Sequence, residues 1–389
     1  MSDLFALDAV LPALTPVHRI VEIADPDELA CYLRAWEQLV EQAAEPNVFY
    51  APCALLPAVR HLGGNQAIRV LLFFRAGEET ILDGILPLFA KPCLGRLAVL
   101  HSYRHRYCFS AEPLLRRGQE REIAQGFVAW LYQHRFLCPL LSLRGLDSEG
   151  VWFFALRHAL NGRGIHYHQS VPVQRALLRI EGGLESFLER TPAKKRKEYR
   201  RLREKLAALG KLQVQLLQPG ADDLQEWLDA FVALELKGWK GREGTALGSR
   251  SECRRFFEET ARGAHQQGSL MMVRMSLDGR PVAMLCDLLA PPGRYAFKTA
   301  YDEDYARYAP GVLLEIENAC LTFQAPHGVE WLDSCAAPDN ALLNRLYPHR
   351  RSLIDISICA LGMARAGLWA SLGLKQLRQQ VRRRGKVLQ

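Results

Sequence analysis

The stretch from Arg294 to Ile356 constrains the fold of this chain most, because strand and helix patterns follow one another there in a fixed order. It begins with RYAFKTAY, whose alternation of apolar and polar residues and many aromatics are typical of a strand. After a loop, apolar residues recur at helical spacing from Gly311 until Pro326 and Gly328 end the pattern. The sequence then predicts a strand, a short helix and a last strand at Val329–Ser334, Asn340–Tyr347 and Arg351–Ile358.

The start of the predicted helix at Gly311 is a candidate phosphate site. A helix that begins after a strand presents unpaired backbone N–H groups and the positive end of its dipole. We therefore predict that cofactor phosphates bind between Tyr308 and Leu313. Within this segment Gly311 and Val312 supply backbone N–H groups to the phosphates, and Arg307, just before it, adds positive charge.

Several segments of the C-terminal half carry a family resemblance. They are FKTAYDEDYARYAPGVLLEIENA (Phe297–Ala319), WLDSCAAPDNALLNRLYPHRR (Trp331–Arg351), TPAKKRKEYRRLREKLAALG (Thr191–Gly210) and LKGWKGREGTAL (Leu236–Leu247). Together they resemble the GNAT superfamily of N-acetyltransferases, in its BioF2-like or FemAB-like branch, in which two such domains lie in tandem. The resemblance implies an α/β fold, with a central mixed sheet flanked by helices in each domain. It also implies acetyl-CoA or another acyl-CoA as co-substrate and an amine as acceptor.

The N-terminal half has a similar order of patterns. The sequence predicts helices at Pro26–Ala44, Ala54–His61, Glu122–Arg135 and Val151–Leu160. It predicts strands at Ala67–Arg75, Ile81–Ala90, Leu140–Gly145 and Tyr167–Ile180. An internal duplication is therefore plausible, although no short motif repeats. A strand ends in a Gly pair at Gly182 and Gly183, so we predict domains at 1–180 and 181–364, followed by a basic tail at 365–389.

Acyl transfer to an amine needs a deprotonated amine, a polarised thioester carbonyl and a proton for the departing thiolate. The family pattern has Asn, six residues and Tyr after the second strand, and Asn340 and Tyr347 hold those places. The resemblance implies Asn340 as a cofactor-binding residue. The resemblance thus implies Tyr347 as general acid, the alternative being a packed aromatic residue. We nominate Asp333 as general base because it ends its strand. Asp287 and Asp302 are lesser candidates, and an ordered water is the alternative to all three.

Cys335 suggests a second mechanism, in which a thiol takes the acyl group before passing it on. His349 is close to it in sequence, but a free Cys is more often a small buried residue. The family's glycine-rich phosphate loop is also missing, since Pro310 stands there and offers no N–H. This departure leaves room for an acyl carrier protein or an aminoacyl-tRNA as donor.

The loop KGWKGREGTAL matches one that lies near the acceptor in the resembling family. An exposed loop bearing Trp239, Arg242 and Glu243 suits substrate binding, although Trp239 could equally pack into the core.

The charge of this chain is concentrated in two places. Residues 190–205 hold nine basic and two acidic side chains, and residues 365–389 hold seven basic and no acidic ones. The first run would meet an acidic carrier protein or tRNA, and the amphipathic tail would either rest on an anionic membrane or cap its own domain. For either run the alternative is a solvated helix face.

Composition restricts the remaining possibilities. At 389 residues and 49% apolar composition, two domains are expected. No signal peptide or spanning segment is evident, and ten scattered cysteines without a CxxC pair indicate reduced thiols in the cytoplasm and no metal. The pairs His101/His105 and His166/His168 lack nearby partners for a metal site.

We therefore expect an N-acyltransferase that moves an acyl group from acyl-CoA to an amine by direct attack in a ternary complex. The alternatives are a transferase that uses carrier protein or aminoacyl-tRNA as donor, a non-catalytic scaffold of the same fold, and an unrelated α/β protein.

Overall fold

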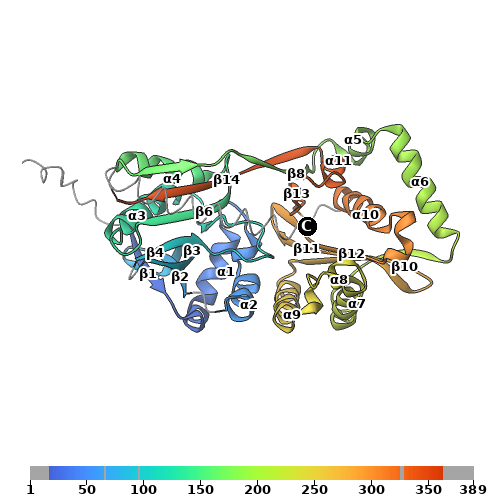
Figure 1. Cartoon of the computed structure of the whole chain (residues 1–389), viewed down its shortest axis with the longest axis horizontal. Helices are drawn as coiled ribbons and strands as arrows, with labels where there is room; N and C mark the ends of the chain where they lie inside the picture. Colours follow the sequence, from blue (N-terminus) through green and yellow to red (C-terminus); the bar gives the residue numbers. More distant parts are fainter. Residues whose placement is uncertain (1–16, 65–66, 95–96, 325–327, 362–389) are drawn as a thin grey trace, which may run out of the picture.

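The computed structural model describes residues 17–64, 67–94, 97–324 and 328–361 (Figure 1). The predicted basic tail at 365–389 therefore lies outside the described residues. The elements of the N-terminal half are β1 (His18–Ile23), η1 (Pro26–Tyr32), α1 (Leu33–Glu41), η2 (Val48–Tyr50), α2 (Pro52–Leu62), β2 (Ala67–Arg75), β3 (Glu78–Leu94), β4 (Leu97–Ser102), β5 (Leu114–Leu115), α3 (Glu120–Gln133), β6 (Leu140–Asp147), α4 (Val151–Gly162), β7 (His166–Gln169) and β8 (Val173–Arg179).

The C-terminal half continues with the same mixture of helices and strands. Its elements are α5 (Gly183–Arg190), α6 (Ala193–Ala207), β9 (Leu212–Leu216), α7 (Leu224–Lys237), α8 (Trp239–Arg242), η3 (Leu247–Ser249), α9 (Ser251–Gln266), β10 (Leu270–Leu277), β11 (Arg280–Ala290), β12 (Gly293–Tyr301), η4 (Glu303–Tyr308), α10 (Pro310–Gln324), β13 (Trp331–Asp333), α11 (Leu343–Leu346) and β14 (His349–Cys359).

All the described strands join one 14-stranded mixed sheet, in the order β1-β2-β3-β4-β6-β14-β8-β13-β12-β11-β10-β9. Strand β5 pairs with β3, and β7 pairs with β14. In each half a run of antiparallel strands is followed by one parallel pair, which is β4 with β6 in the N-terminal half and β12 with β13 in the C-terminal half. In each half a long helix, α3 or α10, lies in the chain between the two parallel strands. The strand order thus repeats between the halves.

The two halves exchange their last strands. Strand β8 leaves the N-terminal half to pair with β13, whereas β14 crosses back to pair with β6, and β8 and β14 pair with each other in the middle. Figure 1 shows β14 as the long red strand that runs along the top from one half to the other. The predicted domain boundary at residues 180 and 181 falls between β8 and α5 in the chain, but the sheet itself does not divide there.

The core is also shared. One cluster of buried apolar residues includes Trp36 and Phe49 of the N-terminal half together with Phe257 and Phe297 of the C-terminal half. Helix α2 packs against α9 across the junction, as Figure 1 shows. On the other face of the C-terminal sheet, α6 and α10 cover a separate cluster that contains Leu206 and Leu313.

Local sequence explains several elements. At the β10–β11 turn, Asp278 and Gly279 both have positive φ, 49° and 79°, which is the conformation that a tight hairpin requires. Pro192 separates α5 from α6, as expected for a residue that has no N–H to donate inside a helix. The pattern at 167–180 forms two strands, β7 and β8, rather than one, and β1, β4 and β5 were not predicted.

Candidate functional site

The parallel strands β12 and β13 separate after a short pairing. Only Gly293–Tyr295 pairs with Trp331–Asp333, after which β13 ends while β12 continues to Tyr301. Just beyond this point the register of β12 against β11 shifts between Cys286 and Leu288, as an inserted residue in β12 would produce. The β12 backbone beyond Tyr295 thus pairs with no described strand on the side of β13, so its amide and carbonyl groups there can bind an extended ligand.

Helix α10 begins close to this opening. Arg307 and Tyr308 end η4, Ala309 adopts the left-handed conformation, and Gly311 lies in the first turn of α10. The guanidinium of Arg307 lies 4.8 Å from the centre of the Tyr308 ring. The predicted phosphate-binding residues Arg307 to Val312 thus lie in η4 and the first turn of α10, and their role stays a prediction.

The backbone at this helix start is less open than predicted. The amides of Val312 and Leu313 both donate to the carbonyl of Ala309, so these two N–H groups are already paired. A Cβ atom on Gly311 would lie 3.2 Å from the Tyr301 ring. Asn340 serves at another helix, since its Oδ1 accepts from the amide of Leu343 at the start of α11.

Tyr347 is fully buried against α10. Its hydroxyl donates to Oε2 of Glu315 at 3.1 Å, and the hydroxyl of Thr299 donates to Oε1 of the same carboxyl at 2.8 Å. Burial, with a smaller effect of Asp287, raises the pKa of Glu315 to about 7. Burial and the charge of Glu315 raise the pKa of Tyr347 well above its usual range, so Tyr347 keeps its proton.

Two of the carboxylates considered as bases are held in ion pairs. Asp287 is buried and accepts from Nε of Arg294 at 2.7 Å and from Asn318 at 3.0 Å. Asp302 pairs with Lys237 at 2.8 Å and accepts from the amide of Asp304 at the start of η4. These contacts fit structural roles.

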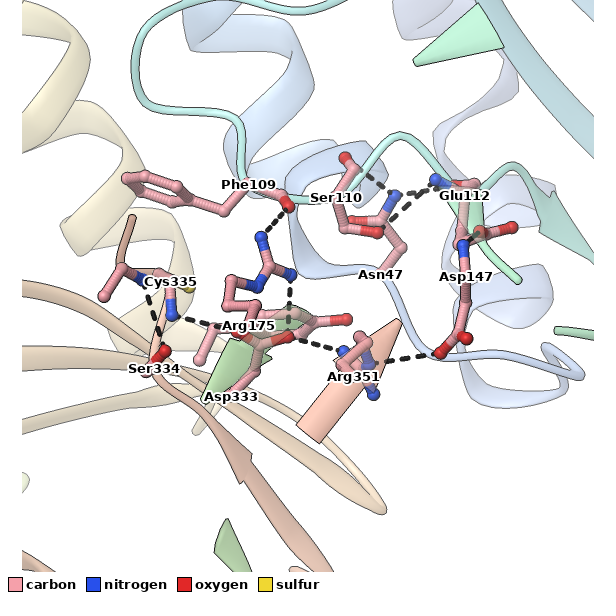
Figure 2. Close-up of polar contacts among 12 residues, drawn as sticks. Asn47, Phe109, Ser110, Glu112, Asp147, Arg175, Asp333, Ser334, Cys335 and Arg351 are labelled. Atoms are coloured by element: carbon pink, nitrogen blue, oxygen red, sulfur yellow. Dashed lines mark hydrogen bonds and ion pairs between the residues drawn. The ribbon is translucent and has the colours of Figure 1, made fainter. Parts of the chain in front are cut away.

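Asp333 lies where β13 ends and is completely buried. Its Oδ2 accepts from Arg175 and from Arg351, each at 2.7 Å, as Figure 2 shows. Burial alone would raise the pKa of Asp333, but the two guanidinium charges hold it below its usual value. Arg175 and Arg351 are direct cross-strand partners in β8 and β14, and like charges in that position repel unless an anion lies between them. Asp333 is that anion.

Cys335 is buried two residues further on, and its amide donates to Oδ1 of Asp333. Burial raises the pKa of its thiol well above the usual range, which disfavours the nucleophilic thiolate. His349 pairs instead with Glu181 at 3.1 Å and accepts from the amide of Arg179. No described contact supports a Cys–His dyad.

A cavity of about 230 Å³ lies between the halves, beside Asp333. Tyr295 and Trp331, at the end of the β12–β13 pairing, line it together with Arg175 and Arg351. The N-terminal half supplies three acidic side chains to the lining, which are Glu45, Glu112 and Asp147. None of these seven residues was predicted as a site residue from the sequence. They come from distant segments, and no local pattern predicts that they meet.

The predicted acceptor loop lies on the surface beside α7. Trp239 is 46% exposed and lines a small hollow of about 30 Å³ with Lys240 and Tyr301. Arg242 pairs with Glu303 at 2.7 Å, and Glu243 is exposed. The loop thus contacts η4, and its role in substrate binding stays a prediction.

The corresponding position in the N-terminal half differs in charge. The first turn of α3 carries Glu120 and Glu122, whereas the first turn of α10 carries no acidic residue. Negative side chains at a helix start repel a phosphate. Of these two helix starts, α10 is therefore the one whose charge would favour a phosphate, and a phosphate site there stays a prediction.

Among the described residues, no group of three or more His, Cys, Asp or Glu side chains could hold a metal ion. His101 is buried and stacks on Phe89, and burial lowers its pKa to about 4. Burial lowers the pKa of His105 to about 3, and its ring meets Phe256 edge-on. His166 and His168 lie on β7. In the described part of the chain, no helix is long and apolar enough to cross a membrane.

Comparison with known proteins identifies one domain family. Residues 193–340 match the family model of the acetyltransferase (GNAT) domain. No curated protein matches the chain.

Solved structures share the fold over most of the chain. A structure of FemX is 10% identical with a TM-score of 0.55, and the match covers 87% of this chain and 96% of FemX. The C-terminal domain of a putative lysylphosphatidylglycerol synthetase from Agrobacterium fabrum is 13% identical with a TM-score of 0.52, covering 89% and 96%. L-PGS from Bacillus licheniformis is 13% identical with a TM-score of 0.51, covering 90% and 95%. At these identities the likeness concerns the fold.

Proposed function

We propose that this chain, an acyltransferase of the GNAT superfamily through its residues 193–340 and with the FemAB-like tandem fold, transfers an acyl group from acyl-CoA to an amine. The opening between β12 and β13 is the observation that supports this most directly. It leaves the β12 backbone unpaired beyond Tyr295, next to the start of α10. The pantetheine arm of a CoA thioester carries amides that would pair with that edge, and Arg307 would add charge near the phosphates.

The two sides of this opening suit different steps of the reaction. Tyr347 and Glu315 lie on the side of α10, whereas the cavity with Trp331 and Asp333 beside it lies between the halves. In direct attack, the neutral amine forms a C–N bond with the thioester carbonyl carbon and the C–S bond breaks. Tyr347 gives its proton to the departing thiolate and recovers one from Glu315.

The proton that the amine must lose has several possible acceptors. Asp333 is ionised, as a base must be, but its Oδ2 is already shared by two guanidinium groups. We therefore assign Asp333 to orienting Arg175 and Arg351, and we place the base among ordered water and the cavity carboxylates.

A macromolecular donor is the second candidate. Helix α6 rests on the body through Tyr199, Leu202 and Leu206, and its basic side chains face solvent. Such a face would attract an acidic carrier protein or the phosphates of an aminoacyl-tRNA. One structure of the same fold is named for lysylphosphatidylglycerol, a lipid that bears a lysyl group. Membrane contact through residues 365–389 and a location in the cytoplasm stay predictions.

A ligand series separates these donors. Thermal shifts are measured with CoA, acetyl-CoA, longer acyl-CoAs, an acylated carrier protein and aminoacyl-tRNA, because only a ligand that prefers the folded protein raises the midpoint. Transfer of a labelled acyl group from the binding donor to a mixed amine pool then tests catalysis. We expect acyl-CoA to bind and to be consumed. Binding of aminoacyl-tRNA alone would replace the first candidate with the second, and binding of none would leave a scaffold.

A further inference from the structure

The cavity between the halves contains a hydrogen-bond acceptor and a donor that are both unused. Oε2 of Glu112 and Nε of Arg175 have no hydrogen-bond partner among the described residues. The two side chains are only 6% and 5% exposed, and both line the cavity. A buried polar atom without a partner is destabilising, so such atoms are usually completed by water or a ligand.

The donor side is fixed in direction. Arg175 gives one Nη group to the carbonyl of Phe109 at 2.8 Å and the other to Asp333 at 2.7 Å. These contacts hold the guanidinium plane, and Figure 2 shows it between Phe109 and Asp333. Its remaining N–H is therefore preorganised for an acceptor in the cavity, such as a carboxylate oxygen.

The acceptor side holds more carboxyl groups than cations. Oε1 of Glu112 accepts from the amide of Asp147, and Asp147 pairs with Arg351 at 3.2 Å. Glu45 accepts from the amide of Val151 at 2.7 Å and, among the described residues, has no ion-pair partner. Burial first, and then the charge of Glu45, raise the pKa of Glu112 well above its usual range. A cation that reached Oε2 of Glu112 would lower this pKa, so that the carboxyl ionises when the cation binds.

We propose that this cavity binds the acceptor substrate as an amino acid, whose ammonium group meets Glu112 and Glu45 and whose carboxylate meets Nε of Arg175. The inference rests on the proposed function for the role of this ligand as acceptor. At about 30 Å³ per water, the cavity would hold several waters or one small organic molecule. Tyr295 and Trp331 give it an apolar wall at the point where β12 and β13 separate, so a ligand in the cavity lies beside the opening where the thioester is expected.

Binding to the unaltered protein is the first test and needs no donor. Calorimetry compares the common α-amino acids and β-alanine with ethylamine, which lacks the carboxylate, and with propionate, which lacks the amine. We expect at least one amino acid to bind about tenfold or more tightly than either fragment. Equal binding of ethylamine would reduce the site to an amine pocket and overturn the inference. Binding of propionate alone, or of no amino acid, would overturn it as well.

Two conservative variants locate the bound groups. Arg175→Lys keeps a positive charge beside Asp333 but removes the Nε donor. Glu112→Gln keeps an acceptor for Asp147 but cannot ionise when an ammonium group binds. Each should weaken amino-acid binding about tenfold or more. The control variants Arg203→Lys and Glu317→Gln, which alter an ion pair at the surface, should leave binding unaltered. Unchanged binding in both cavity variants would overturn the assignment.

Donor binding is measured on the same samples, which separates this inference from the proposed function. Amino-acid binding without acyl-CoA binding or transfer would uphold the site and reject the CoA-dependent reaction. Acyl transfer that proceeds equally well to amines without a carboxylate would uphold the reaction and reject the site.

Discussion

The hydroxyl of Tyr347 donates a hydrogen bond to the carboxyl of Glu315, 3.1 Å away, whose pKa is raised to about 7. Tyr347 immediately follows α11, whereas Glu315 lies in α10, so the pair joins the two helices that flank the opening between β12 and β13. A phenol that keeps its own proton and can regain one from a neighbour near pH 7 is suited to protonate a thiolate.

Replacing Tyr347 by Phe should lower turnover by about 10²-fold and change the Michaelis constant little, because the hydroxyl acts mainly in the transition state. Loss of its buried hydrogen bond should also cost about 1 kcal/mol of unfolding free energy. Tyr50→Phe is a matched control, since that hydroxyl is equally buried and donates to the carbonyl of Tyr103. Equal turnover in the two variants would make Tyr347 a packing residue.

Glu315 should make stability fall as the pH rises. In the unfolded chain its carboxyl ionises near its usual pKa of about 4.3, but in the folded protein the pKa is about 7. Between these values the folded state holds a proton that the unfolded state has lost, so stability decreases by a few kcal/mol across this window. Glu315→Gln cannot titrate, and its urea-unfolding free energy should decline less from about pH 4.5 to 7. Parallel curves for variant and wild type would contradict the raised pKa.

Replacing Gly311 by Ala should weaken CoA binding severalfold. The added Cβ meets the Tyr301 ring and narrows the approach to the start of α10, where the phosphates are expected. Calorimetric titration with CoA measures the effect. Gly126→Ala, within α3 and with only Ile20 near its new Cβ, is the control and should bind CoA normally. Unchanged affinity in a folded Gly311→Ala protein would move the phosphate site elsewhere.

Asp333→Asn should act on stability more than on the pH dependence of turnover. Removing the shared charge leaves Arg175 and Arg351 facing each other in the sheet, which should cost about 3–5 kcal/mol of unfolding free energy. Chemical denaturation measures the loss of unfolding free energy, and a pH–rate profile of the remaining activity measures the pH dependence of turnover. A profile that loses its acidic limb would restore Asp333 as general base.

Cys335→Ala should keep most of the activity. The thiol is buried, its pKa is raised and no His lies in the contacts described for it, so it lacks the features of a nucleophile. We expect a stability loss of about 1 kcal/mol and no covalent acyl adduct by mass spectrometry of the wild type with acyl-CoA. An adduct that disappears in the variant would establish the covalent route.

Periodic segments could be predicted from the sequence, whereas their partners could not. The strand RYAFKTAY and the helix after Gly311 follow from local patterns, and both are present as β12 and α10. Strand exchange escaped prediction because the apolar alternation in β8 and β14 says which face is buried but not which strand lies alongside. The GNAT resemblance led to Tyr347, and the end of a strand led to Asp333. Each contacts other polar side chains, and their catalytic roles stay predictions. Glu45 and Glu112 come from irregular segments of the other half, and only the folded chain brings them to Arg175.

The exchange of β8 and β14 also determines when this protein can finish folding during its synthesis. The ribosome makes the N-terminal half first, but the strand that pairs with β6 is the last one described in the chain. Until β14 emerges, the nascent protein exposes an unpaired strand edge, which invites pairing with other chains. A ribosome that stops early would therefore release not one finished domain but an incomplete sheet, which chaperones or proteases would have to remove.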